Sequence, residues 1–299
     1  MEENNSQGDC HIAPVLPKKM RLQEYGVGLF SQCPAKSGLK KALKAGKITV
    51  NGEKATTATF IQGGEEIQYH VEENSEKVFT DDFLVKVVFE DDFLAVVNKP
   101  AGILVSGNNR RTVARALPVV LKKSSQPDCT TPHPVHRLDF PTTGLLLTGK
   151  TYTTIRALNL LFEERKVKKT YLAIAIGAMN KHSGKINGEL DGKMCSTDFE
   201  VVASVPSPKF EYLNLVRLHP ETGRKHQLRK QLAAMGNPIL GDADYGIEGL
   251  IIQRKGLYLH HYQMEFMHPQ TDELCATVSP LPKKFKKIFP NIPGFEFQK

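Results

Sequence analysis

The stretch PHPVHRLDFPTTGLLL, residues 132–147, constrains the fold more than any other part of the sequence. Prolines on both sides of VHRLD stiffen this polar segment directly before a turn and an apolar run, which we expect to be a buried strand. Arg137 and Asp139 are one residue apart, so in an extended segment their side chains point to the same side. A carboxylate near a guanidinium stays ionised and can act as a nucleophile, but the same pair can also simply pin a turn. The residues alone leave both interpretations open.

The charge balance favours a polyanionic partner. Lysine and arginine number 40 against 32 acidic residues, which gives a formal net charge of +8. The length of 299 residues, with 40% hydrophobic residues, is sufficient for a full-sized core and a small additional module. Charge alone does not identify nucleic acid, because many basic proteins bind nothing charged.

Cysteine usage and hydropathy indicate a cytoplasmic protein with no membrane partner. The five cysteines are widely spaced and form no CxxC pair, so neither a disulfide framework nor a zinc cluster is indicated. No apolar run approaches membrane-spanning length, and the start MEENNSQGDC lacks the layout of a signal peptide. We expect residues 1–17 to be a disordered lead-in.

Most of the excess positive charge lies in one segment near the N-terminus. Residues 18–54 contain nine basic and two acidic residues. Within them, SGLKKALKAGKITVNGEKA predicts a helix that Ser37 caps and Gly46 ends, followed by a strand and a tight turn at NG. The helix would bury an apolar face and direct three lysines away from the core: Lys40, Lys41 and Lys44. These lysines are candidate RNA contacts, or else an ordinary solvated helix face.

The motif KAGKITVNG in this segment resembles the S4-type RNA-binding domain. The resemblance implies a small RNA-binding domain over residues 18–70. The acidic, polar segment VEENSEKVFTDD, residues 71–82, predicts a linker, and residues 83–299 are expected to form the catalytic domain.

Two further positions stand out in the larger part of the chain. Tyr171 begins an apolar strand directly after the basic segment ERKVKK, and an aromatic ring beside cations suits a nucleobase, although packing is an equally ordinary role for such a tyrosine. Lys99, in the loop sequence NKPAG, is either a phosphate contact or a surface lysine, and spacing favours the surface.

The segment TGRKHQLRKQLAAMGNPILGDADYG predicts a helix with cations at its start. Leu228, Leu232 and Met235 would form its buried face, with His226 and Arg229 on another. Positive side chains conflict with the dipole at a helix N-terminus, and such a local conflict indicates a function, here phosphate binding.

Three segments together resemble the RluA-type family of RNA pseudouridine synthases: HRLDFPTTGLLL, KKTYLAIAIG and TGRKHQLRKQLAAMGNPILGDADYG. VVNKPAGILV lies upstream and LYLHHYQMEFMHP downstream, so that the resemblance spans residues 85–282. The chain departs from the family pattern in having Thr143 in place of serine and Lys225 in place of threonine.

The resemblance implies a role for each matching residue. Asp139 would be the catalytic aspartate and Tyr171 the tyrosine against the target base. Arg229 would form an ion pair with Asp139, and Arg137 would help to flip or hold the RNA. The cationic start of the predicted helix makes Arg224 and His226 further candidate RNA contacts. The implied fold is α+β, with a mixed, largely antiparallel sheet, and the implied reaction uses neither a metal nor a redox cofactor.

The implied reaction converts uridine to pseudouridine. The enzyme breaks the N1–C1′ bond, turns the uracil over and joins C5 to C1′, with the target base extruded from its stack. Asp139 would act as nucleophile toward the ribose or as base in a glycal route, and the sequence does not distinguish them.

Two other function classes need consideration. A non-catalytic RNA-binding protein of this fold would be marked by loss of the aspartate, which is present, and a carboxylate-dependent hydrolase would need a second paired acid. We therefore expect a synthase, acting as a monomer on ribosomal RNA of the large subunit rather than on transfer RNA.

Overall fold

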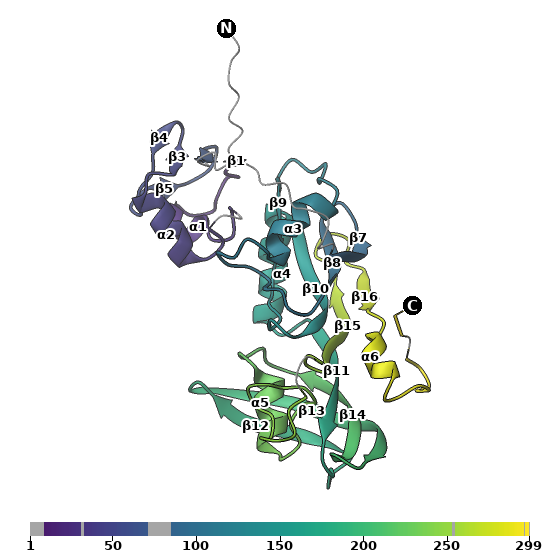
Figure 1. Ribbon diagram of the computed structural model, residues 1–299. Helices are drawn as coiled ribbons and strands as arrows, with labels where there is room; N and C mark the ends of the chain where they lie inside the picture. The colour runs from purple at the N-terminus through teal and green to yellow at the C-terminus, as the bar shows by residue number, and fades with distance from the viewer. Residues whose placement is uncertain (1–8, 31–32, 71–84, 253–254, 296, 299) are drawn as a thin grey trace.

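The computed structural model describes residues 9–30, 33–70, 85–252, 255–295 and 297–298. Within these residues the chain forms a small N-terminal module and a second, larger region built on one long sheet (Figure 1). Each of the two regions has its own core of buried apolar side chains.

The N-terminal module contains two short helices, a four-stranded sheet and a two-stranded sheet. The helices are α1 (Leu22–Tyr25) and α2 (Lys36–Lys44). The larger sheet has the order β1 (Asp9–Ile12), β6 (Glu66–Tyr69), β3 (Ile48–Val50) and β4 (Glu53–Lys54), with every pair antiparallel. The smaller sheet pairs β2 (Met20–Arg21) with β5 (Phe60–Ile61).

Helix α2 agrees with the sequence in its faces and its end but not in its cap. The predicted apolar face is buried and the three lysines are exposed. Gly46 follows the helix with a φ of +66°, a conformation that glycine adopts without a Cβ clash. The prediction of Ser37 as the cap is wrong, because the helix begins two residues earlier, after Ala35, and has no side-chain cap.

The prediction of a disordered lead-in over residues 1–17 is wrong where the structure describes the chain. Strand β1 pairs residue by residue with β6, and Ala13 is buried in the core of the module. The polar sequence of β1 does not predict a strand. The strand forms because its backbone hydrogen-bonds to the otherwise open edge of β6, which is distant in the sequence. Residues 1–8 and the predicted linker, residues 71–82, lie outside the described residues.

The long sheet is mixed and largely antiparallel. Its main path runs in the order β12 (Ser183–Leu190), β13 (Lys193–Ser207), β14 (Glu211–Pro220), β11 (Lys168–Ile176), β15 (Leu259–Met267), β10 (Thr143–Thr151), β8 (Leu94–Lys99) and β7 (Lys86–Glu90). Two strands lie off this path: β9 (Cys129–Pro134) pairs with β10, and β16 (Leu274–Val278) pairs with β15. Among these strands only the β10–β15 pair is parallel. The predicted α+β fold with a mixed, largely antiparallel sheet is confirmed.

Four helices lie around this sheet: α3 (Val113–Val120), α4 (Tyr152–Glu163), α5 (Gln227–Ala234) and α6 (Lys283–Lys286). Threonine hydroxyls cap the first two, because Thr112 accepts from the amide of Arg115 and Thr151 from that of Thr154. Helix α4 buries Ile155 and Leu158 on the face that packs against the core. None of the described helices has the length and hydropathy needed to cross a membrane.

The module contacts the larger region at the start of α4 (Figure 1). The Tyr152 side chain, 2% exposed, belongs to the core of the module, and its hydroxyl donates to the carbonyl of Tyr25 at 2.8 Å. The rings of His11 and Tyr25 lie against it. A shared aromatic cluster therefore joins the two regions.

Candidate active site

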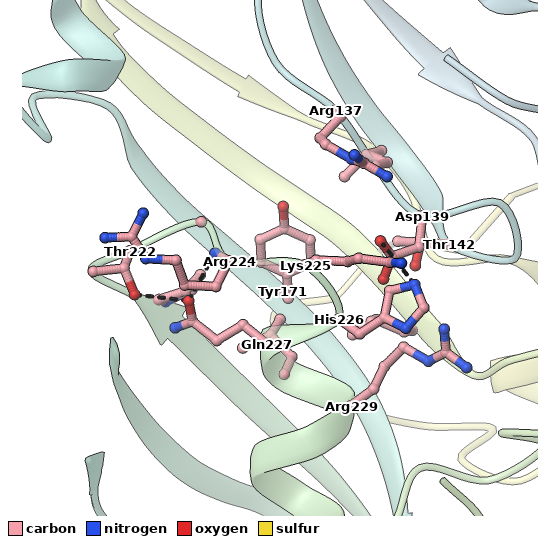
Figure 2. A pocket seen from close by; sticks show the side chains of 15 residues that line it. Arg137, Asp139, Thr142, Tyr171, Thr222, Arg224, Lys225, His226, Gln227 and Arg229 are labelled. Carbon is pink, nitrogen blue, oxygen red and sulfur yellow. Dashed lines mark hydrogen bonds and ion pairs between the residues drawn. The ribbon is translucent and has the colours of Figure 1, made fainter. Parts of the chain in front are cut away.

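A cavity of about 90 Å³ lies where the loop before β10, strand β11 and the start of α5 meet. Six sequence-predicted residues line it (Figure 2): Arg137, Asp139, Tyr171, Arg224, His226 and Arg229. The three lysines of α2 do not contribute to its lining. Residues from three distant segments are thus brought together as the sequence predicted.

A buried lysine organises the loop that carries Asp139. The Lys99 side chain is fully buried, and its Nζ donates to the carbonyl oxygens of Pro100 at 2.9 Å, Phe140 at 3.2 Å and Thr142 at 2.8 Å. The prediction of a surface lysine is therefore wrong. Three acceptors replace the water that the ammonium group loses on burial, and they join the loop after β8 to the loop before β10.

The same ammonium group sets part of the electrostatics around Asp139. Burial lowers the pKa of Lys99 to about 8, and the charge of Asp139 opposes that shift. The ammonium group and the carboxylate therefore attract each other across the loop. The Asp139 side chain is 15% exposed, so it is desolvated but reachable from the cavity.

His226 lies within ion-pair distance of the carboxylate. Its Nε2 lies 3.8 Å from Oδ1 of Asp139, and its Nδ1 lies 2.9 Å from the hydroxyl of Tyr245. Burial lowers the pKa of His226 while the charge of Asp139 opposes the shift. Its backbone is left-handed, with φ +55°, immediately before α5, and this bend directs the ring toward Asp139.

The predicted ion pair between Arg229 and Asp139 is wrong. Arg229 instead binds Asp242 through two parallel hydrogen bonds, Nε to Oδ2 at 2.7 Å and Nη2 to Oδ1 at 2.6 Å, and its Nη2 also reaches Asp244 at 2.7 Å. Asp242 is fully buried, so its bidentate contact is the main interaction of the Arg229 guanidinium. The sequence GDADYG, residues 241–246, could have indicated this pairing, because it supplies two carboxylates within reach of α5. Arg229 lines the cavity but serves to fix α5 against the following loop.

Arg137 and Asp139 also form no ion pair in the described part of the chain, contrary to the extended geometry that the sequence suggested. The loop between β9 and β10 is irregular, and the Arg137 side chain is exposed at the cavity mouth (Figure 2). Its guanidinium is therefore available to a ligand.

Tyr171 forms one wall of the cavity and is 9% exposed. Burial raises its pKa, and the charge of Asp139 adds to the shift. The phenol consequently stays protonated and acts as a hydrogen-bond donor and a flat apolar surface rather than as a base.

A second, wider cavity of about 420 Å³ adjoins the first and shares Arg137, Tyr171 and Arg224 with it. Arg165 and Lys169 add further positive charge to its lining, while two glutamates, Glu163 and Glu221, also contribute. Glu221 is already paired with Lys185. The combined opening is a cationic cleft of the kind that binds a polyanion.

Within the described residues, no cluster of histidine, cysteine and acidic side chains could hold a metal ion.

Four histidines on β9, on β15 and in the loop before β10 are partly or fully removed from solvent: His133 and His136 are partly buried, and His260 and His261 are buried. Burial lowers the pKa of His133 and of His260 to about 4, and that of His136 to about 3. For His261 burial lowers the pKa well below its ordinary value. These rings are neutral at physiological pH, and sequence reasoning had not identified the burial of His260 or His261.

Comparison with known proteins gives a consistent result. The sequence model of a family described as RNA pseudouridylate synthase matches residues 93–234. An uncharacterised RNA pseudouridine synthase of Bacillus subtilis (strain 168), YhcT, is 31% identical, with 84% of this chain and 91% of that protein covered. The ribosomal large subunit pseudouridine synthase C of Rickettsia conorii is 30% identical, with coverage of 82% and 88%. Among solved structures, human RNA Pseudouridylate Synthase Domain Containing 4 is similar with a TM-score of 0.54 and 27% identity, over 67% of this chain and 90% of that one.

Replacing Lys99 with methionine tests the role of the buried ammonium group. Lys99→Met removes the donor that three loop carbonyls share, so we expect the free energy of unfolding to fall by about 3 kcal/mol in urea titrations. Lys86→Met, at an exposed lysine of β7, is the matched control and should change it by less than about 0.5 kcal/mol. Equal stability of the two variants would contradict the assignment.

The buried histidines predict acid sensitivity. Their folded pKa values lie below the unfolded value of 6.5, so their contribution to stability is complete above pH 6.5 and is lost as pH falls toward 4. Each histidine should contribute a slope approaching about 1.4 kcal/mol per pH unit in that window, measured by urea unfolding at several pH values.

A pair of variants separates this effect from the titration of carboxylates. His133→Gln should reduce the slope by about one proton, whereas His182→Gln, at an exposed histidine, should leave it unchanged. An unaltered slope in His133→Gln would show that the buried ring does not carry the effect.

Proposed function

We propose a substrate and a catalytic residue from one premise: the chain belongs to the RNA pseudouridine synthase family. It is therefore an isomerase that acts on RNA. We infer that it converts uridines of large-subunit ribosomal RNA to pseudouridine and that Asp139 is its catalytic carboxylate. The substrate inference is supported by the relative from Rickettsia conorii, which is named as a ribosomal large subunit synthase and aligns over most of both chains.

The observation that carries the catalytic assignment is the isolation of one acid among cations. Asp139 is the one carboxylate among the described residues that line the inner cavity. Every lining side chain that can carry a positive charge is an arginine, a lysine or a histidine, with threonine, tyrosine and glutamine as the uncharged polar residues. A pair of carboxylates, which acid–base hydrolysis of a glycosidic bond uses, is not present in that lining. This arrangement favours transfer of the base within one nucleotide over its release to water.

The reaction balances with one carboxylate. Asp139 attacks C1′ of the ribose, or removes a proton from C2′, as the N1–C1′ bond breaks and the electron pair leaves with the uracil. The uracil turns within the cavity and its C5 bonds to C1′. In the same step the carboxylate either leaves C1′ or returns its proton to C2′. The proton on C5 is then lost, and N1 gains one. No electron is gained or lost overall.

The other lining residues have roles in holding RNA and the base. The neutral phenol of Tyr171 provides a flat wall for the detached uracil, and water exclusion keeps the base in place. Arg137, Arg224 and His226 are placed to contact the nucleotides that flank the target. Arg229 acts indirectly, by fixing α5 through Asp242.

We further propose that the N-terminal module contributes to RNA affinity. The family match covers residues 93–234 and does not extend to residues 18–70, so the S4-type resemblance stands on the KAGKITVNG motif alone. Its support is that Lys40, Lys41 and Lys44 project from one helix into solvent, where phosphates can reach them.

Asp139→Asn tests the catalytic assignment. Loss of the negative charge should lower the rate of pseudouridine formation by about 10³-fold or more, because amide nitrogen and oxygen replace the reacting carboxylate. The loss of hydrogen from C5 gives the measurement, as tritium released from RNA labelled at C5 of uridine. Affinity for RNA should stay within about twofold, since no phosphate contact is removed.

The matched control is Asp191→Asn, at an exposed aspartate in the turn between β12 and β13, which should keep full activity. Activity retained in Asp139→Asn would contradict the catalytic assignment. Transcripts of large-subunit ribosomal RNA and a transfer RNA pool, offered in competition, test the substrate. Preference for transfer RNA would overturn the ribosomal inference and leave the chemistry intact.

A further inference from the structure

The ring of Tyr171 lies against a buried histidine that has no role in the scheme above. We propose that His261 is a positioning residue, which fixes the plane of the Tyr171 ring at the wall of the catalytic cavity. The inference rests on the proposed function, in which Tyr171 faces the detached base. It assigns His261 no contact with RNA.

The strand register places the two rings side by side. Tyr171 on β11 and His261 on β15 are direct partners across the antiparallel pair, and a bulge between Thr170 and Tyr171 shifts the register at this point. Bulges next to active sites commonly redirect a side chain. The two rings are stacked, with centroids 4.3 Å apart and planes only 9° from parallel. Directly opposite aromatic side chains are a stabilising cross-strand pair.

The orientation of the histidine ring is itself fixed. Its Nδ1 lies 2.6 Å from the carbonyl oxygen of Leu145, and because a carbonyl only accepts, Nδ1 carries the hydrogen. The ring of His136 meets it edge-on, with centroids 5.9 Å apart at 84°. The His261 ring is thus held by the hydrogen bond that it donates to β10 and by its edge-on contact with His136, and it cannot rotate without breaking the stack.

A glycine on β10 allows the hydrogen bond between His261 and Leu145 to form. Gly144 pairs with His261 in the one parallel contact of the sheet, at a φ of +112°. A Cβ at this position would lie 2.3 Å from the carbonyl oxygen of His261. The absence of a side chain lets β10 approach β15 closely enough for the carbonyl of the next residue, Leu145, to reach the ring.

Histidine is an unusual choice for this buried position. Its Nε2 is fully buried and has no hydrogen-bond partner in the described structure, which is unfavourable for a polar atom. Burial, together with the neighbouring His136, keeps the ring neutral by lowering its pKa. A phenylalanine would stack without an unpartnered nitrogen, so what histidine adds is the Nδ1–H bond to Leu145. That bond turns a packing contact into one with a defined plane.

A fixed ring plane matters because the base moves during the reaction. The uracil must turn over between bond breaking and bond formation, so a wall that tilts with it would favour unproductive orientations. Tyr171 lines both the inner and the outer cavity, and its orientation therefore shapes the space in which the base turns. Loss of positioning should affect turnover more than binding of the RNA.

Three variants of the full-length chain test the proposal. In His261→Ala, which loses both the stack and the hydrogen bond, we expect kcat to fall about tenfold with KM for RNA changed less than about twofold. His261→Phe restores the stack but not the bond to Leu145 and should recover part of kcat. His260→Phe is the control for loss of a neighbouring buried histidine, since His260 bonds to Thr143 and Ser279 and makes no ring contact with Tyr171. It should lower the melting temperature but keep kcat.

A crystal structure of His261→Ala provides a readout that does not depend on activity, and we expect its Tyr171 ring to be rotated or spread over several orientations. The positioning role would be overturned if His261→Ala left the Tyr171 ring unmoved, left kcat unchanged or only raised KM. It would also be overturned if His260→Phe lost as much kcat as His261→Ala. If the wild-type chain turns over no RNA while the ring moves in the variant, the proposed function fails and the structural role of His261 stands.

Discussion

The site depends on one buried cation. Lys99 ends β8 inside the protein, where its ammonium group loses all contact with solvent and three carbonyl oxygens take the place of water. Moving an ammonium group out of water costs several kcal/mol, so such a residue is stable only where partners are well placed. The partners here belong to the two loops that meet beside Asp139. The same contacts that satisfy the lysine therefore hold the loop that carries Asp139 in shape and set a positive charge near its carboxylate.

The long sheet supplies the rest of the geometry. Asp139 enters from the loop before β10, Tyr171 from β11 and His226 from the residue before α5, and the parallel contact between β10 and β15 brings these elements into register. Neutral histidine rings lie next to the cavity at His136 and His261, while arginine and lysine side chains, together with two glutamates, line the wider opening. Asp139 therefore lies between neutral rings and a predominantly cationic surface that is suited to phosphates.

Sequence patterns predicted what depends on local spacing. Periodicity and motifs predicted the apolar face of α2 and the turn after it. The family that the motifs resemble predicted that Asp139, Tyr171 and His226 would meet in one site. What depends on non-local competition for partners was predicted wrongly. Arg229 binds Asp242 because that carboxylate is closer than Asp139, Lys99 is buried because carbonyls 41 and 43 residues away accept from it, and β1 forms because β6 offers it an open edge.

A pseudouridine map of cellular RNA tests the central claim most directly. Carbodiimide labelling and reverse-transcription stops would be compared between cells lacking the gene and the same cells supplied with the wild-type chain or with Asp139→Asn. The account predicts that one or a few stops in large-subunit ribosomal RNA disappear with the gene and return only with the wild-type chain. An unchanged map, or stops restored by the Asp139→Asn chain, would contradict it.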